Sequence, residues 1–153
     1  MSDQIEIRVR QLTSAEIPAL SVFLSEARLP TEDLLLPDRV FYRFEQDGEL
    51  LGFGGIEGAG SDRLLRSLIV LDSRRGRGNG CRLLAMLEQV ALTDGARRLH
   101  LLTNTASVFF GANGYRTVSR VEAPGTISRS AEFTSLCPAS AVYMVKDMEP
   151  FSD

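Results

Sequence analysis

The chain has 153 residues, of which 44% are hydrophobic and 24% charged, and its formal net charge is −3. This length and composition predict one globular domain over residues 1–153, and the slight acidity is unlike the basic surface of a protein that wraps nucleic acid. No apolar run approaches the ~20 residues that span a bilayer, and residues 1–6 lack the basic and apolar regions of a signal peptide, so we expect no membrane partner and a cytoplasmic location. The two cysteines, Cys81 and Cys137, form neither a metal-finger spacing nor a disulfide framework.

Hydrophobic periodicity and turn residues predict the secondary structure. In the first half we expect a strand over 5–12, a helix that buries Ile17, Leu20, Phe23, Leu24 and Ala27, a helical turn over 29–38, and strands over 40–45, 50–56 and 64–71. In the second half we expect a helix that continues to about Thr93 and stops at Gly95, a strand over 99–103, a short helix ending at Asn113 and Gly114, a strand over 115–121, a short helix over 128–136 and a strand over 141–148. This order predicts an α+β (mixed α/β) fold, in which helices flank a central mixed, mostly antiparallel sheet of six to seven strands.

The most informative stretch is Leu68–Gly80. Its apolar run ends at Leu71, and three glycines alternate at Gly76, Gly78 and Gly80 before an amphipathic helix begins. A strand, a glycine-rich turn and a helix in this order direct several backbone N–H groups and the helix dipole at one point, which favours a bound phosphate group. The alternative to a phosphate site is that the three glycines belong to a loop that binds no ligand. The nearby cations, Arg74, Arg75 and Arg77, either add to the anion site or are solvated.

Two segments resemble a known family. Residues 75–80 fit the [Gln/Arg]-x-x-Gly-x-[Gly/Ala] turn of the GCN5-related N-acetyltransferases, and residues 109–115 resemble the helix and Gly-aromatic segment of that family. The order of strands and helices agrees with this resemblance over nearly the entire chain. Residues 65–68, 101–103, 109–110 and 132–141 also resemble the ArsN2 group, acetyltransferase-like proteins that are associated with arsenic resistance.

The resemblance implies acetyl-CoA as cosubstrate and no metal. The backbone of residues 68–71 would pair with the pantetheine arm as an added strand, and the turn with the N–H of Cys81 would hold the pyrophosphate. Either Thr103 or Asn104 would bond the pantetheine. The implied coenzyme-binding residues are Leu68, Ile69, Val70, Leu71, Arg75, Gly76, Arg77, Gly78, Asn79, Gly80, Cys81, Thr103, Asn104, Phe109 and Phe110.

The chain departs from the family at two positions that carry chemistry. Phe110 stands where many relatives have a tyrosine that protonates the departing thiolate, and no carboxylate lies between Leu64 and Leu71, where relatives often carry a general base. Glu57 is the nearest candidate base, or else a solvated acid at the edge of a loop. We assign catalytic roles to Glu57, Ser67 and Val70, whose neighbouring backbone N–H would polarise the thioester carbonyl. An acceptor that arrives as a free amine would need no strong base.

Arg66, Glu132 and Cys137 are the expected acceptor-binding residues. Arg66 and Glu132 either orient a charged, amino-acid-like substrate or form a structural ion pair. Arsenite prefers several converging thiolates, so two cysteines argue against an arsenic site within one chain, and Cys137 is otherwise a buried, inert thiol.

The sequence therefore predicts an acetyl-CoA-dependent N-acetyltransferase that acts on a primary amine of a small molecule, with a link to arsenic resistance implied by the resemblance alone. Two alternatives remain: a non-catalytic acetyl-CoA sensor, and an arsenic-binding protein that uses Cys137. A homodimer is compatible with this fold.

Overall fold

The computed structural model describes residues 6–76, 78–137 and 140–148. Its strands are β1 (Ile7–Gln11), β2 (Arg39–Gln46), β3 (Glu49–Glu57), β4 (Asp62–Val70), β5 (Arg98–Thr103), β6 (Arg116–Thr117) and β7 (Val142–Asp147). Its α-helices are α1 (Ile17–Glu26), α2 (Asn79–Thr93), α3 (Ser107–Ala112) and α4 (Gly125–Ser128). Short 3₁₀ turns lie at Ser14–Glu16, Asp72–Arg74 and Arg120–Glu122, and one π-helical turn lies at Glu132–Leu136.

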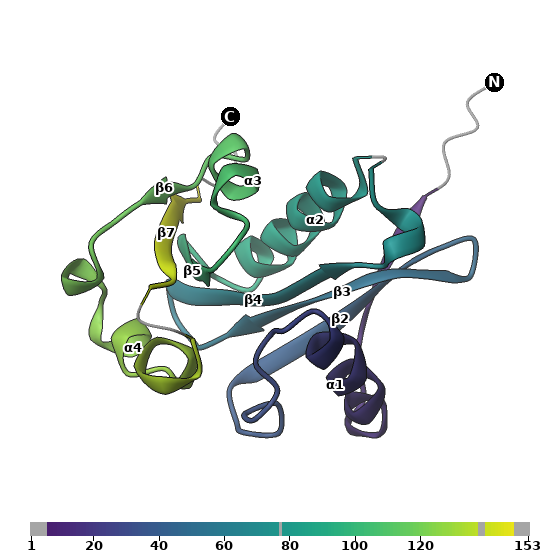
Figure 1. The fold of residues 1–153 in the computed structure, drawn as a ribbon, viewed down its shortest axis with the longest axis horizontal. Helices are drawn as coiled ribbons and strands as arrows, with labels where there is room; N and C mark the ends of the chain where they lie inside the picture. The colour runs from purple at the N-terminus through teal and green to yellow at the C-terminus, as the bar shows by residue number, and fades with distance from the viewer. Residues whose placement is uncertain (1–5, 77, 138–139, 149–153) are drawn as a thin grey trace.

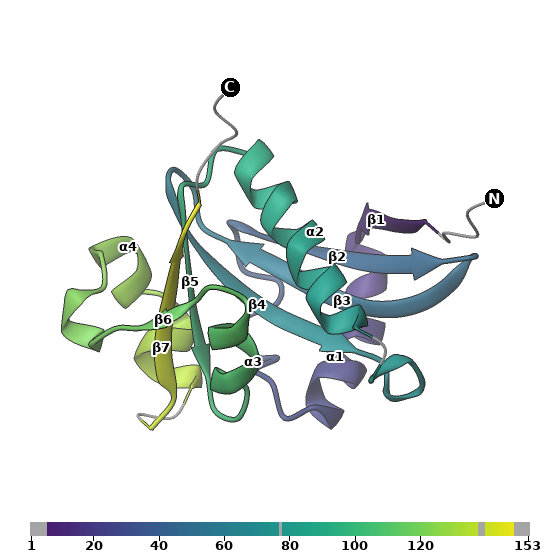
Figure 2. The same cartoon turned by 90° about the horizontal axis from the view of Figure 1, so that it is seen from above.

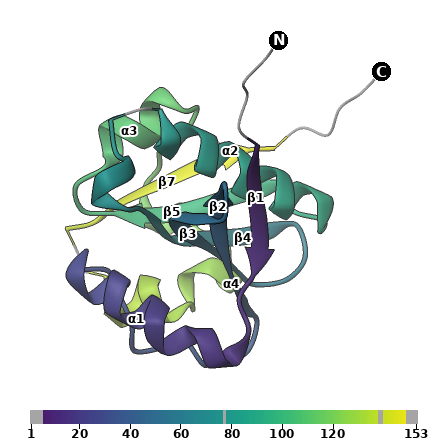
Figure 3. The ribbon, with the colours of Figure 1, turned by 90° about the vertical axis from the view of Figure 1, so that its right-hand side faces the viewer.

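The seven strands form one mixed sheet in the order β1-β2-β3-β4-β5-β7-β6. Helices α2 and α3 cover one face, and α1 and α4 cover the other (Figures 1 and 3). The expected fold class, a mostly antiparallel mixed sheet flanked by helices, is confirmed. Within the described residues, no helix is both long and apolar enough to span a bilayer.

The pairing of β4 with β5 is the one parallel contact among the described strands, and it is short. It joins Asp62 to Arg98, Arg63 to Leu99 and Leu64 to His100. Beyond these three pairs the two strands diverge, as Figure 2 shows. The centre of the sheet therefore opens on the carboxyl-terminal side of Leu64.

A β-bulge in β4 lies just beyond this point. The register against β3 shifts between Phe53 and Gly55, so β4 has one residue more than β3 in this interval, and Ser67 has a positive φ of 60°. A Cβ atom at Gly54 would lie 2.8 Å from Leu87 of α2. Glycine at this position lets α2 pack directly against the bulged part of the sheet.

Apolar side chains fill both sides of the sheet. The largest cluster packs α2 onto the sheet, and a second packs α1 against the opposite face. A smaller cluster around Leu64, Ile127 and Tyr143 anchors α4. The side chains of these two clusters that are 0% exposed are Phe44, Leu51, Leu83, Leu87, Ala96, Leu99, Leu20 and Leu24.

The helical turn expected over 29–38 corresponds to hydrogen-bonded turns at 32–35, which bury Asp33. Two other expected elements differ from the structure. The strand expected over 115–121 is only two residues long, because the chain leaves the sheet edge for the 3₁₀ turn at 120–122. The helix expected over 128–136 is divided into α4, which begins directly after Pro124, and the π-helical turn.

Candidate active site

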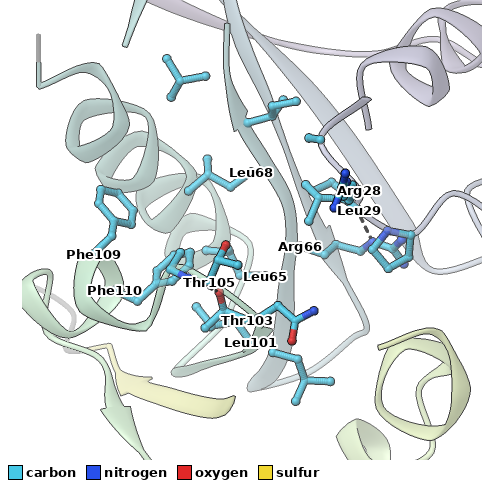
Figure 4. Close-up of a pocket in the computed structure, with 18 of the residues that line it drawn as sticks. Arg28, Leu29, Leu65, Arg66, Leu68, Leu101, Thr103, Thr105, Phe109 and Phe110 are labelled. Carbon is cyan, nitrogen blue, oxygen red and sulfur yellow. Dashed lines mark hydrogen bonds between the residues drawn. The ribbon is translucent and has the colours of Figure 1, made fainter. Parts of the chain in front are cut away.

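A cavity of about 1020 Å³ occupies the opening between β4 and β5. Its walls come from β4, the glycine turn, the end of β5, α3 and the loop after α1. In Figure 4, Phe109 and Phe110 stand on one side, Arg28 and Leu29 stand on the other, and Leu65 and Leu68 lie between them.

The glycine turn forms one end of this cavity. Gly76 and Gly78 have positive φ values of 79° and 76°, and no atom lies within 4 Å of a Cβ built on either. The 15-residue helix α2 begins at the next residue, where the Asn79 side-chain amide donates a hydrogen bond of 2.9 Å to the Arg74 carbonyl. Backbone N–H groups and the positive end of a long helix therefore converge on open space, as an anion requires. We call this part of the cavity the coenzyme end.

Most of the residues expected to bind a coenzyme line the cavity together. These are Leu68, Ile69, Val70, Arg75, Gly76, Gly78, Gly80, Cys81, Thr103, Asn104, Phe109 and Phe110. Leu71 and Asn79 do not line it, and Arg77 lies outside the described residues. The Arg75 Nε donates to the Val70 carbonyl at 3.0 Å, and the Thr103 hydroxyl accepts from the Ala106 N–H at 3.0 Å.

Of the aromatic residues after β5, Phe109 and Phe110 line the cavity, whereas Tyr115 does not. The Phe110 ring lies edge-on to both Phe109 and Tyr115. Tyr115 is buried, and its hydroxyl donates to Glu88 of α2 at 2.8 Å. Burial and the Glu88 carboxylate raise the pKa of Tyr115 well above its usual range. Because Tyr115 does not line the cavity, it is not placed to replace the tyrosine missing at Phe110.

The opposite end of the cavity, here called the acceptor end, contains a buried group of charged side chains. Five residues form this buried charge cluster: Asp33, Arg39, Glu57, Arg66 and Glu132. The Arg66 side chain is fully buried and lies at the centre of the cluster. It donates to both Asp33 oxygens at 2.5 and 2.7 Å and to Glu57 at 3.0 Å, its Nη2 lies 3.2 Å from Glu132, and its Nε donates to Ser67 at 3.3 Å.

These contacts show what each predicted side chain is paired with. Glu57 is buried and accepts from Arg39 at 2.8 Å through one oxygen and from Arg66 through the other. It is therefore neither solvated nor in contact with the cavity. Ser67, Val70, Arg66, Glu132 and Cys137 all line the cavity, and their expected roles stay predictions.

Sequence reasoning missed Asp33 and the loop residues beside it. Asp33 lies in a segment expected only to turn, and its ion pair with Arg66 joins positions 33 residues apart, which no local pattern indicates. Residues 27–32 line the cavity for the same reason: the turn after α1 carries them there. The Arg28 side chain has no ion-pair or hydrogen-bond partner among the described residues.

Burial and charge shift several pKa values at the acceptor end. Although burial opposes it, hydrogen bonds from Arg66 lower the pKa of Asp33. Burial raises the pKa of Glu132 to about 7; Arg66 opposes this shift, and the carboxylates of Asp33 and Glu57 add to it. Burial and the nearby Glu132 raise the pKa of Cys137 to about 12, so its thiol is protonated at neutral pH.

Comparison with known proteins identifies the family. The model of the acetyltransferase (GNAT) domain matches residues 37–117, which is more than half of the chain. The chain therefore belongs to the GNAT acetyltransferase family. No curated protein sequence matches it.

Solved structures share the fold at low sequence identity. N-acetylglutamate synthase from Neisseria gonorrhoeae, complexed with coenzyme A and L-arginine, is 20% identical with a TM-score of 0.76; the match covers 97% of this chain but only 35% of that one. A GNAT-family acetyltransferase from Staphylococcus aureus is 13% identical with a TM-score of 0.71, and the match covers 94% and 100% of the two chains. The aminoglycoside 6'-N-acetyltransferase from Enterococcus faecium is 18% identical with a TM-score of 0.66, and the match covers 95% and 99%. The chain thus spans about a third of the synthase and nearly all of the other two.

Proposed function

We propose that this protein is an acetyl-CoA-dependent N-acetyltransferase that transfers the acetyl group to a primary amine of a small molecule. The observation that carries the proposal is the cavity between the diverging strands β4 and β5, with the glycine turn at one end and the buried charge cluster at the other. The membership of the GNAT family and the coenzyme A bound to the N. gonorrhoeae synthase support acetyl-CoA as the cosubstrate.

The geometry suggests how this chain would hold both substrates. The coenzyme's pyrophosphate would lie against the N–H groups of Gly78, Gly80 and Cys81, and its pantetheine arm along the part of β4 that no longer pairs with β5. The thioester would then lie near Val70 and Ser67, between the two ends of the cavity. Holding acetyl donor and amine together converts a bimolecular reaction into one within a complex, which is the main catalytic contribution expected here.

The test is a pair of glycine variants with matched strain. Gly78→Ala and Gly60→Ala both place a Cβ in open space at a φ near 80°, so both should lose a similar stability of about 1 kcal/mol. Only Gly78 lies in the proposed pyrophosphate site. We expect the Gly78 variant to bind acetyl-CoA at least ~10-fold more weakly by calorimetry, a change of ~1.4 kcal/mol, and the Gly60 variant to bind like the wild type. Equal affinity in the two variants would contradict the proposed coenzyme site.

Catalysis is tested separately from binding. The proposed enzyme releases CoA thiol from acetyl-CoA in proportion to an added amine, whereas a sensor binds acetyl-CoA and releases none. Suitable amines are L-glutamate, an aminoglycoside and spermidine, which differ in charge and size. Arg28 at the cavity wall favours acceptors that also carry an anionic group.

The link to arsenic resistance belongs to the same proposal, and its support is the sequence resemblance. The neutral thiol of Cys137 is a poor ligand for arsenite, and the described residues contain no group of three histidine, cysteine or acidic side chains that could hold a metal ion. We therefore expect arsenite alone not to raise the melting temperature. Stabilisation by arsenite that Cys137→Ser abolishes would instead favour an arsenic-binding protein.

A further inference from the structure

One carboxylate at the acceptor end is only partly paired. Arg66 Nη2 lies 3.2 Å from Oε2 of Glu132, and Oε1 accepts a long hydrogen bond of 3.9 Å from the Cys137 thiol. In contrast, guanidinium groups donate to both oxygens of Asp33 and to both oxygens of Glu57. Among the described members of the buried charge cluster, Glu132 is therefore the carboxylate with an oxygen to which no guanidinium group donates.

Glu132 is also the carboxylate of the cluster that reaches the reaction cavity. It lines the cavity with Ser67 and Val70, where the thioester is proposed to lie, whereas Asp33 and Glu57 do not line it. Its side chain is only 5% exposed, so a charge on it is little screened by water. It comes from the π-helical turn between α4 and β7, outside residues 37–117 that match the family model.

We propose that Glu132 is the catalytic base that takes the proton from the ammonium group of the acceptor. This inference rests on the proposed function. The ammonium nitrogen gives one proton to Oε1 of Glu132, and the resulting amine attacks the thioester carbonyl carbon. The C–N bond forms, the C–S bond breaks, and a second proton from the nitrogen passes to the departing thiolate to give CoA thiol. Glu132 then releases its proton to solvent.

The surrounding charges suit this role. Arg66 faces Glu132 from β4, Arg39 from β2, Glu57 from β3, and Asp33 from the turn after α1, with the Cys137 thiol beside it. Three carboxylates thus share two guanidinium groups. Burial and this negative excess raise the pKa of Glu132 to about 7, and a general base is most effective when its pKa lies near the pH of the reaction.

The experiment compares three glutamate-to-glutamine variants. Glu132→Gln removes the proposed base, Glu57→Gln removes the base expected from the sequence, and Glu122→Gln changes an exposed glutamate outside the cavity. Each is assayed from pH 5.5 to 9 for CoA release, once with an amine from the panel above that the wild type acetylates, and once with hydroxylamine. Hydroxylamine is largely unprotonated at neutral pH, so its acetylation needs no base.

We expect Glu132→Gln to reduce kcat with the protonated amine about 10²–10⁴-fold and to keep its activity with hydroxylamine. The break in the pH profile of kcat/KM near pH 7 should disappear, and kcat/KM should instead rise with pH across the whole range, following the small fraction of free amine. The Glu122 variant should keep the wild-type pH profile. The Glu57 variant should keep an acidic limb that is displaced to lower pH, because it lacks one of the carboxylates that raise the pKa of Glu132. A Glu132→Gln variant with wild-type kcat and pH profile overturns the inference, and so does loss of the acidic limb in Glu57→Gln alone.

Two further measurements cover the remaining outcomes. If Glu132→Gln does not fold, Glu132→Asp replaces it in the experiment. This variant should have a lower kcat but keep the acidic limb of the pH profile, and loss of that limb in the Asp variant would contradict the role of Glu132 as base. The failure of the proposed function looks different: a wild type that binds acetyl-CoA but acetylates neither an amine nor hydroxylamine overturns the enzyme itself. If the wild type acetylates amines and the Glu132 variant acetylates them equally well, only the role of Glu132 as base is overturned.

Discussion

The two ends of the cavity are built in opposite ways. The coenzyme end comes from one continuous stretch, the end of β4, the glycine turn and the start of α2, and it presents mainly backbone groups. The acceptor end combines side chains from β2, β3, β4, the turn after α1 and the π-helical turn, and it contains buried charges. The shape of the coenzyme end depends on the backbone of one segment, whereas the acceptor end depends on ion pairs between residues far apart in the sequence. Mutations should therefore affect binding at the first end and stability at the second.

The largest effect on stability should come from Arg66→Met. The side chain is fully buried and contacts three carboxylates, which its removal leaves with Arg39 as their remaining cation. Breaking buried ion pairs from one side typically costs about 3–5 kcal/mol. Urea unfolding at pH 7 should show such a loss, with Arg98→Met as the control, since the half-exposed Arg98–Asp147 pair should contribute less than about 1 kcal/mol. Equal losses in the two variants would mean that the buried charge cluster contributes no more to stability than a half-exposed ion pair.

The pH dependence of stability should show a smaller effect. The pKa of Glu132 is raised from its ordinary 4.5 to about 7 in the folded protein, so between these values the folded chain holds a proton that the unfolded chain has released. Unfolding then releases a proton, and the contribution of Glu132 to stability is lost as the pH rises from about 4.5 to 7.

This loss can be isolated with Glu132→Gln. Between pH 5 and 8 the free energy of unfolding of the wild type should fall by ~1–3 kcal/mol relative to that of the variant, because each pKa unit corresponds to about 1.4 kcal/mol. Urea unfolding at several pH values measures this difference. Parallel curves for the two proteins would mean that the carboxylate titrates alike in the folded and unfolded chains.

The smallest effect should come from Tyr115→Phe, which changes a residue close to the coenzyme end but outside the cavity. The variant loses the hydrogen bond to Glu88, which retains Lys146, so we expect a cost of about 1 kcal/mol and an unchanged kcat. Tyr42→Phe is the control, as its hydroxyl has no hydrogen-bond partner among the described residues. A large fall in kcat would instead make Tyr115 the missing proton donor to the thiolate.

The same contrast explains what could be predicted from the sequence. The glycine turn and its strand–helix context occupy neighbouring positions, and the periodicity of residues 79–93 identifies α2 directly. These signals are local, so they predict the fold class and an anion-binding turn, whereas the role of the β4 backbone beside the coenzyme is implied by the family resemblance. Short irregular elements such as β6 lack such signals, because tertiary packing sets their length.

The acceptor end was predicted only in part for the same physical reason. The residue types predict that Arg66 and Glu132 lie close together. They do not show that Asp33 and Glu57 accept hydrogen bonds from the other N–H groups of Arg66. That competition decides which carboxylate keeps an oxygen to which no guanidinium group donates. It depends on register and on the path of the turn after α1, neither of which is encoded in the residue types alone.

The short parallel contact between β4 and β5 has a mechanical consequence. It divides the sheet into two parts, β1–β4 and β5–β7. Three residue pairs, the side chain of His100, whose Nε2 lies 2.7 Å from Asp62 across the joint, and the apolar cluster beneath α2 connect the two parts. The joint lies at one end of both strands, so a small rotation there is amplified into a larger change of width at the open end. A coenzyme bound along β4 and against α3 would contact both parts of the sheet and hold them together. The protein would then become more rigid on binding, including in regions that the ligand does not contact.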